Sequence, residues 1–209
     1  VWPATMILAC PRITGREHLR GLRGPMLFIA NHVTEEDVGF VLAALPHRYR
    51  YRLAIAMNGE RLRDLRHPPA ELGWFRRLVD PGGYLLVSAL FNAFAMPKQS
   101  GVRRSFQFAG ETVDRGYSVL VFPEGQLTRD GKLSEFRGGI GVLAKTLRIP
   151  VVPMRIDGLY ELREARRRVA RPGTVRITIG EPIRFDPATA PEEITSRLRL
   201  SIEHLAIER

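Results

Sequence analysis

The feature that most constrains the fold is an alternation of short, continuous apolar runs with longer stretches of helical periodicity. Continuous apolar runs are typical of strands buried on both faces of a sheet, and their alternation with helices is typical of α/β proteins. We therefore predict a single-domain α/β fold with a mixed, mostly parallel sheet flanked by helices. The predicted strands span residues 27–30, 52–57, 118–122, 151–156 and 174–180.

Four segments between or after these strands have helical patterns, at residues 34–45, 102–115, 139–147 and 191–207. Thr34 is the expected N-cap of the first, and Gly116 is the expected C-terminal cap of the second. A chain of 209 residues without a Gly-, Ser- or Pro-rich linker favours one domain. We expect this domain to span residues 1–209, with a motif-bearing core at about 24–183 and a C-terminal helix at about 191–207.

The chain is strongly basic, with 32 Lys and Arg against 22 Asp and Glu, a net charge of +10. Such a surface attracts nucleic acid, anionic lipid headgroups or phosphorylated small molecules. The single cysteine, Cys10, excludes an internal disulfide framework. The longest nearly unbroken apolar stretch, residues 84–96, is shorter than the ~20 residues that a membrane-spanning helix needs. We expect no signal peptide, because no basic and apolar leader opens the sequence.

The first candidate for chemistry follows the predicted strand 27–30, where the sequence reads Asn31-His32-x-x-x-x-Asp37. If His32 lies in the turn and Asp37 lies in the first helical turn, the carboxylate can accept a hydrogen bond from one imidazole nitrogen. The other nitrogen is then free to act as a general base. In the alternative interpretation, Asp37 only caps the helix and His32 is an ordinary hydrogen-bonded residue at a strand end.

The second candidate follows the predicted strand 118–122, where Pro123-Glu124-Gly125 places a carboxylate and a glycine in a sharp turn at the edge of the sheet. This string is otherwise an ordinary turn. Basic residues that are candidates for binding a phosphate lie after this turn and at the start of helix 102–115, namely Arg129, Lys132, Arg137, Arg103 and Arg104.

Together, these motifs resemble those of the glycerolipid acyltransferases typified by 1-acyl-glycerol-3-phosphate acyltransferase. The resemblance is carried by His32-x-x-x-x-Asp37, by Phe122-Pro123-Glu124-Gly125 and by residues 149–153, Ile-Pro-Val-Val-Pro, and covers about residues 24–183. It implies a glycerophosphate-acyltransferase-like fold. It further implies transfer of a fatty acyl group from acyl-CoA or acyl-carrier protein to the free hydroxyl of a lysophospholipid, giving phosphatidate from 1-acyl-glycerol-3-phosphate.

The resemblance also assigns roles to residues. It implies that His32 is the general base, that Asp37 orients it, and that Glu124 and Gly125 form the turn that binds the acceptor. Arg103 or Lys98 falls near the motif whose basic residue contacts the acceptor phosphate, and Arg104, Arg129 and Arg137 are further candidates for that phosphate. No metal and no cofactor are expected, because the acyl thioester is a co-substrate.

The sequence departs from the family motifs at two places that concern recognition of the acceptor. Leu127 stands where the family often has a phosphate-contacting arginine, and residues 94–98 match the second family motif only loosely. A different lysolipid acceptor, such as lysophosphatidylethanolamine, therefore stays open with the same chemistry. A basic nucleic-acid-binding domain is the alternative from another class; it explains the charge but neither turn. A module that binds a lipid surface and has lost its activity is a third alternative.

Two arginine-rich segments are candidates for contact with an anionic surface. In residues 59–80, Trp74, Phe75 and Leu78 accompany Arg76 and Arg77, as expected of an interfacial helix. Residues 163–171 contain five arginines, and a solvated helix face is the alternative there. We expect peripheral association with the cytoplasmic face of a membrane, and no nucleic acid as partner.

Overall fold

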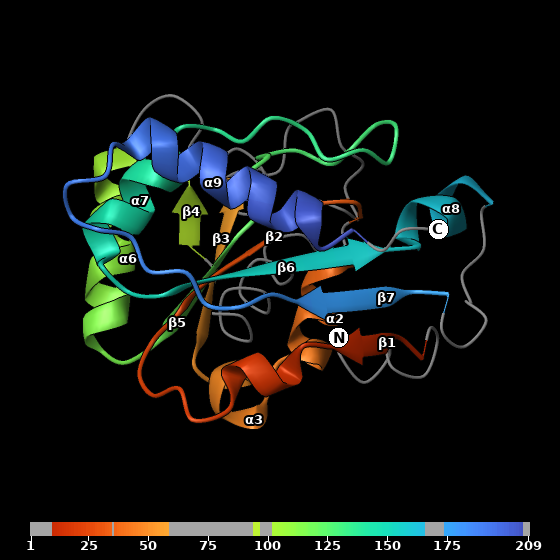
Figure 1. The fold of residues 1–209 in the computed structure, drawn as a ribbon, viewed down its shortest axis with the longest axis horizontal. Coiled ribbons are helices and arrows are strands. Elements are labelled where there is room, and N and C mark those ends of the chain that lie inside the picture. Colours follow the sequence, from red (N-terminus) through yellow and green to blue (C-terminus); the bar gives the residue numbers. More distant parts are fainter. Residues whose placement is uncertain (1–9, 35, 59–93, 97–101, 166–173, 207–209) are drawn as a thin grey trace, which may run out of the picture.

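A computed structural model describes residues 10–34, 36–58, 94–96, 102–165 and 174–206 (Figure 1). In these ranges, the core is a seven-stranded sheet with the order β1-β7-β6-β2-β5-β3-β4. Only β6 and β7 pair in antiparallel orientation among the described strands, so the predicted mixed, mostly parallel sheet is confirmed. The strands are β1 (Arg12–Thr14), β2 (Leu27–Ala30), β3 (Leu53–Asn58), β4 (Phe94–Met96), β5 (Ser118–Val121), β6 (Val151–Asp157) and β7 (Arg176–Ile179).

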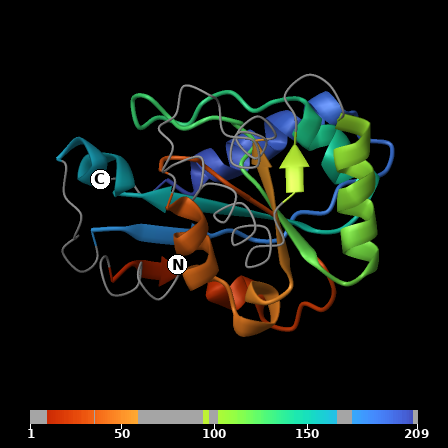
Figure 2. The same ribbon diagram turned by 180° about the vertical axis from the view of Figure 1, so that it is seen from behind.

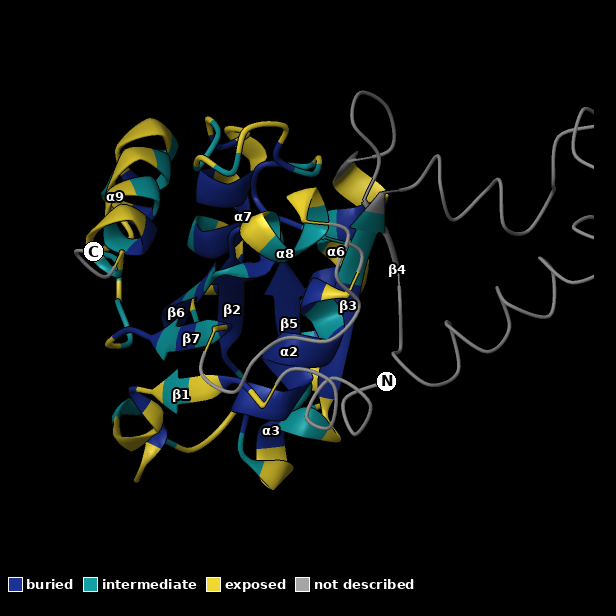
Figure 3. Ribbon diagram, turned by 90° about the vertical axis from the view of Figure 1, so that its right-hand side faces the viewer, coloured by how far each residue is buried: buried dark blue, intermediate teal, exposed yellow. Residues whose placement is uncertain are grey.

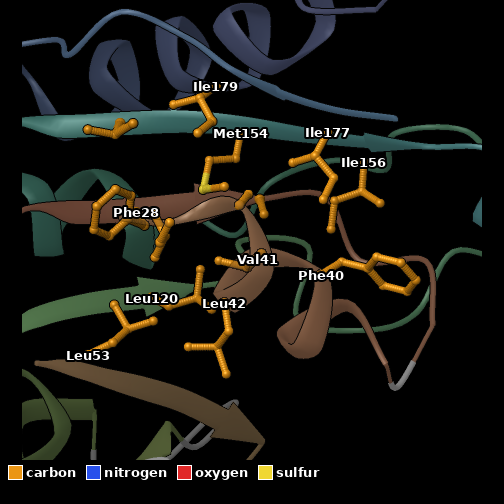
Figure 4. Close-up of a cluster of buried hydrophobic side chains, with 14 of the residues drawn as sticks. Phe28, Phe40, Val41, Leu42, Leu53, Leu120, Met154, Ile156, Ile177 and Ile179 are labelled. Atoms are coloured by element: carbon orange, nitrogen blue, oxygen red, sulfur yellow. The ribbon is translucent and has the colours of Figure 1, made fainter. Parts of the chain in front are cut away.

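Helices cover both faces of the sheet, as the fully buried central strands require (Figure 3). One core cluster joins Phe28 of β2 to α2 (Asp37–Ala44), α3 (His47–Arg50) and the 3-10 turn η1 (Arg16–Leu19). Figure 4 shows this cluster, in which α2 side chains meet strand side chains. The other cluster joins Leu27 to α6 (Val102–Asp114), α7 (Gly139–Leu147) and α9 (Pro191–His204). The two clusters alternate along β2 because successive side chains of a strand point to opposite faces.

The order of the strands places three chain segments together at one edge. The chain leaves β2 for β3 on one side, returns through β5 next to β2, and then passes through α7 to β6 on the opposite side of β2. β2, β5 and β6 are parallel, so their carboxyl ends meet at a point where the direction of winding reverses. Ligands of open α/β sheets bind at such switch points. The green segment between β5 and α7 runs along this edge (Figure 2).

Most predicted elements are present, with boundaries shifted by a few residues. The predicted helix 34–45 is shorter, since α2 begins at Asp37 with Glu36 as its N-cap residue. The prediction of Thr34 as N-cap is therefore wrong; its N–H and hydroxyl instead donate to the Asp37 carboxylate. Gly116 has φ 80, as predicted for the residue that ends α6.

Several short elements were not predicted, including β1, β4, α3 and α8 (Leu159–Glu164). They are too short to show a periodicity in the sequence. The helix α8 occupies the start of the arginine-rich segment 163–171, and lies beyond the carboxyl end of β6 (Figure 1). The rest of that segment, from residue 166, and the residues of segment 59–80 lie outside the described ranges, as does Lys98. None of the described helices has the length and apolar character needed to cross a bilayer.

Candidate active site

The side chains of His32 and Asp37 meet at the carboxyl end of β2. His32 Nδ1 lies 2.9 Å from Asp37 Oδ2, and the Asp37 side chain is fully buried. The predicted hydrogen bond is thus confirmed. The two residues can meet because the helix begins only at Asp37, so His32 lies outside it, whereas five positions of a continuous helix would rotate the side chains apart.

The Asp37 carboxylate also organises the backbone of this turn. Its oxygens accept hydrogen bonds from Val33 N at 2.5 Å, from Thr34 N at 3.1 Å and from Thr34 Oγ1 at 2.9 Å. The carboxylate therefore performs both roles that the sequence left as alternatives, since it stabilises the turn and holds the imidazole. A carboxylate with this many donors has its orientation fixed before any substrate arrives.

The other imidazole nitrogen, Nε2, has no hydrogen-bond partner within the described ranges, and the His32 side chain is 21% exposed. Its ring stacks on Phe122, with ring centroids 4.3 Å apart and an interplanar angle of 21°. A carboxylate only accepts hydrogen bonds, so in a neutral imidazole this contact selects the form protonated at Nδ1, which leaves Nε2 as the acceptor. The arrangement is that of an oriented general base.

Glu124 connects this turn to the segment that follows β5. Its Oε1 accepts a hydrogen bond from His32 N at 2.8 Å, and its Oε2 accepts one from Ser134 N at 2.8 Å. The Glu124 residue is only 3% exposed, and burial raises the pKa of its carboxyl while the hydrogen bonds from His32 and Ser134 lower it. The described contacts of Glu124 therefore hold two loops together, a role that the sequence analysis did not predict.

Gly125 allows the turn after β5 to pass close to Arg137. Its φ is +67, and a Cβ built there would lie 2.3 Å from Arg137 Nε. Arg137 Nε donates to the carbonyl of Glu124 at 3.4 Å, and its exposed side chain lies against this turn. The structure thus brings one predicted phosphate-binding arginine next to the residues that hold His32.

Three other predicted basic residues, Arg103, Arg104 and Arg129, lie around the same edge of the sheet. Arg103 and Arg104 are exposed in the first turn of α6, which follows the carboxyl end of β4. Arg129 is exposed in the segment between β5 and α7. Because β4 is parallel to β3 and β3 to β5, the start of α6 faces the same side as His32.

Three further residues hold the site and were not assigned a role from the sequence. The Asn31 side chain donates to the carbonyl of Ile156 at 2.9 Å and accepts from its N–H at 2.7 Å, which ties the end of β2 to β6. Thr128 N donates to the carbonyl of His32 at 2.9 Å. Arg163 of α8 donates to the carbonyls of Val33 and Thr128. Only Asn31 had a signal in the sequence, its position directly before His32.

The described strands form an open α/β sheet with an imidazole–carboxylate pair at its switch point, where sheets of this class bind their ligands. The chain belongs to the acyltransferase family, whose sequence model matches residues 10–157. The resemblance of the sequence motifs to this family is therefore confirmed.

Individual relatives are similar over most of the chain. It is 26% identical over 172 residues to "1-acyl-sn-glycerol-3-phosphate acyltransferase BAT2, chloroplastic" of Brassica napus, covering 82% of this chain and 44% of that protein. It is 29% identical over 161 residues to a 1-acyl-sn-glycerol-3-phosphate acyltransferase of Cocos nucifera, covering 77% of this chain and 46% of the relative. The chain thus spans less than half the length of these two relatives.

A solved structure shares the fold. The crystal structure of the 1-acyl-sn-glycerophosphate acyltransferase PlsC from Thermotoga maritima superposes with a TM-score of 0.68 at 22% sequence identity. The match covers 96% of this chain and 72% of the PlsC chain. The similarity confirms the predicted glycerophosphate-acyltransferase-like architecture.

Proposed function

We propose that the chain carries the acyl-transfer site of an enzyme that acylates a lysophospholipid, with 1-acyl-glycerol-3-phosphate as acceptor and phosphatidate as product. The observation that carries the proposal is the orientation of His32, whose Nδ1 is held by the buried Asp37 while Nε2 has no partner among the described residues. The activity for which the two plant relatives are named supports the same reaction.

In the proposed reaction, Nε2 of His32 accepts the proton of the acceptor hydroxyl. The hydroxyl oxygen then attacks the thioester carbonyl, an oxygen–carbon bond forms and the carbon–sulfur bond breaks. The thiolate leaves with the proton that His32 held, so the products are an ester and a free thiol. Histidine side chains titrate near neutrality, so an imidazole can both accept and return this proton.

The acceptor phosphate requires positive charge close to the base. Our first candidate to bind it is Arg137, because its side chain lies against the glycine turn that holds Glu124; the further candidates are Arg103, Arg104, Arg129 and Lys98. Arginine is suited to a phosphate because its planar guanidinium donates two parallel hydrogen bonds. Leu127, where the family often has an arginine, is the reason to test lysophosphatidylethanolamine as the alternative acceptor.

The substrates also define the proposed surroundings of the enzyme. Lysophospholipids reside in bilayers, and the net charge of +10 favours an anionic membrane surface, so we place the protein peripherally on the cytoplasmic face. The acyl donor is acyl-CoA or acyl-carrier protein. The proposed membrane contact at Trp74 and Phe75 lies outside the described residues.

The test is a thiol-release assay in which acyl-CoA and acyl-carrier protein are each combined with lysophosphatidate and with lysophosphatidylethanolamine. Thiol should appear only when an acceptor is present, and His32→Ala should lower kcat by about 100-fold or more. His204→Ala, at the exposed end of α9, is the matched control and should keep wild-type kcat. Wild-type turnover in His32→Ala would overturn the mechanism. Steeply salt-dependent duplex binding without acyl transfer would instead support the nucleic-acid-binding class.

A further inference from the structure

Arg163 occupies an unusual place for an arginine of a surface helix. Its Nη1 donates to the carbonyl of Val33 at 2.9 Å and to the carbonyl of Thr128 at 3.1 Å, and its Nη2 donates to the same Thr128 carbonyl at 3.2 Å. Val33 follows His32 directly, and Thr128 belongs to the segment after β5. A single guanidinium therefore joins the two loops that make up the candidate site.

Both carbonyls belong to residues that hold the imidazole. Thr128 N donates to the carbonyl of His32 at 2.9 Å, and Val33 N donates to the Asp37 oxygen that also faces His32 Nδ1. Arg163 thus binds the carbonyl groups of two residues, Val33 and Thr128, whose N–H groups donate to Asp37 and to the His32 carbonyl, respectively. Hydrogen bonds from a charged donor are shorter and stronger than those between neutral groups.

The rest of α8 holds this guanidinium in place. The Arg163 guanidinium lies over the ring of Tyr160, 4.8 Å from its centroid, and Tyr160 Oη donates to the carbonyl of Arg129 at 3.2 Å. A Cβ at Gly131 would lie 2.7 Å from the Tyr160 ring, so the loop fits against α8 only with a glycine there. Two neighbouring side chains of α8 therefore contact the segment 128–131.

We propose that Arg163 is a positioning residue for the acyl-transfer reaction, acting by locking the His32 turn to the segment after β5. It lies after residue 157, where the match to the family ends. Its guanidinium donates to main-chain carbonyls rather than to the imidazole, so its effect passes through the backbone of Val33 and Thr128. The predicted effects on kcat rest on the proposed function. The predicted effect on the orientation of His32 does not depend on which reaction the site catalyses.

A positioning role predicts a loss in kcat rather than in KM. Displacing a catalytic group by about 1 Å can cost about 100-fold in rate, so Arg163→Ala should lower kcat about 10- to 100-fold with KM for both substrates nearly unchanged. Arg163→Lys should recover only part of this loss, because one ammonium cannot span both carbonyls as a planar fork does. Guanidinium ions, added to Arg163→Ala below denaturing concentrations, should restore part of kcat.

The matched control is Arg197→Ala in α9, which removes another arginine whose guanidinium lies over an aromatic ring, that of Phe185, 5.4 Å from its centroid. It should keep wild-type kcat. The ¹⁵N NMR signals of His32 give a readout independent of turnover. Wild type and Arg197→Ala should show the form protonated at Nδ1, whereas Arg163→Ala should show exchange between the two neutral forms.

The outcomes separate the two proposals. Unchanged kcat and unchanged His32 signals in folded Arg163→Ala would overturn the positioning role. A raised KM for the phosphate-bearing acceptor with wild-type kcat would overturn it too, and would assign Arg163 to the acceptor. If wild type transfers no acyl group but the His32 signals change in Arg163→Ala, the proposed function fails and the positioning of His32 by Arg163 stands.

Discussion

The main-chain N–H of His32 donates to Glu124 Oε1 at 2.8 Å, although the two residues are 92 positions apart in the sequence. The second carboxylate oxygen of Glu124 binds Ser134 N. The position of the candidate base therefore depends on a buried carboxylate that contacts its backbone rather than its ring.

Asp37→Asn should lower kcat about 100- to 10,000-fold in the thiol-release assay. The amide can still accept from the turn, but it no longer selects the imidazole form protonated at Nδ1, and loss of that selection has effects of this size in catalytic triads. Glu36→Gln is the control, since Glu36 is the exposed neighbour at the N-cap. A kcat of Asp37→Asn equal to that of Glu36→Gln would contradict the assignment of Asp37.

Glu124→Gln should lower the free energy of unfolding by about 1–3 kcal/mol. An amide has one acceptor oxygen, so one of the two half-buried N–H groups of His32 and Ser134 loses its partner. Urea unfolding measures the difference, and kcat should fall as well because the His32 turn loosens. Glu135→Gln, on the same loop and with a side chain that is 88% exposed, should change neither quantity. Equal unfolding midpoints for the two variants would show that the hydrogen bonds from His32 N and Ser134 N to Glu124 do not stabilise the fold.

The difference in the free energy of unfolding between wild type and Glu124→Gln should depend on pH, with a sign set by the pKa of Glu124. Burial raises the pKa of Glu124 above 4.5, so the folded state binds the proton more tightly than the unfolded state does. The contribution of Glu124 to the free energy of unfolding is then fully present below pH 4.5 and declines as the pH rises through the raised pKa. The stability difference between wild type and Glu124→Gln should shrink over this window. A difference that grows with pH would mean that the two backbone hydrogen bonds outweigh burial.

Gly125→Ala should destabilise the protein by about 1–2 kcal/mol, because its φ of +67 is unfavourable for residues with a Cβ. The new methyl group also displaces the Arg137 side chain, so KM for a phosphate-bearing acceptor should rise. Thermal unfolding and acceptor titrations measure the two effects. Gly110→Ala in α6, where a Cβ meets nothing within 4 Å, should instead stabilise the protein by about 0.5–1 kcal/mol. An unchanged KM in Gly125→Ala would remove Arg137 from the acceptor site.

Local patterns in the sequence were sufficient for the main strands, for α6, α7 and α9 and for the His32–Asp37 pair. Apolar periodicity reflects burial of one face of a helix or both faces of a strand, and five positions are few enough for a turn to bring an imidazole to a carboxylate. The N-cap at Thr34 was predicted wrongly because the Asp37 carboxylate draws Thr34 N and its hydroxyl into the turn instead.

By itself, the sequence determined the α/β class, the order of the principal elements and the identity of the candidate base and its carboxylate. Only the tertiary structure decided what holds that base in place. Glu124 and Arg163 reach the His32 turn across 92 and 130 positions, respectively. Such contacts depend on β2, β5 and β6 becoming neighbours in the sheet, and the pairing of parallel strands is set by packing of the whole chain rather than by the residues near the turn.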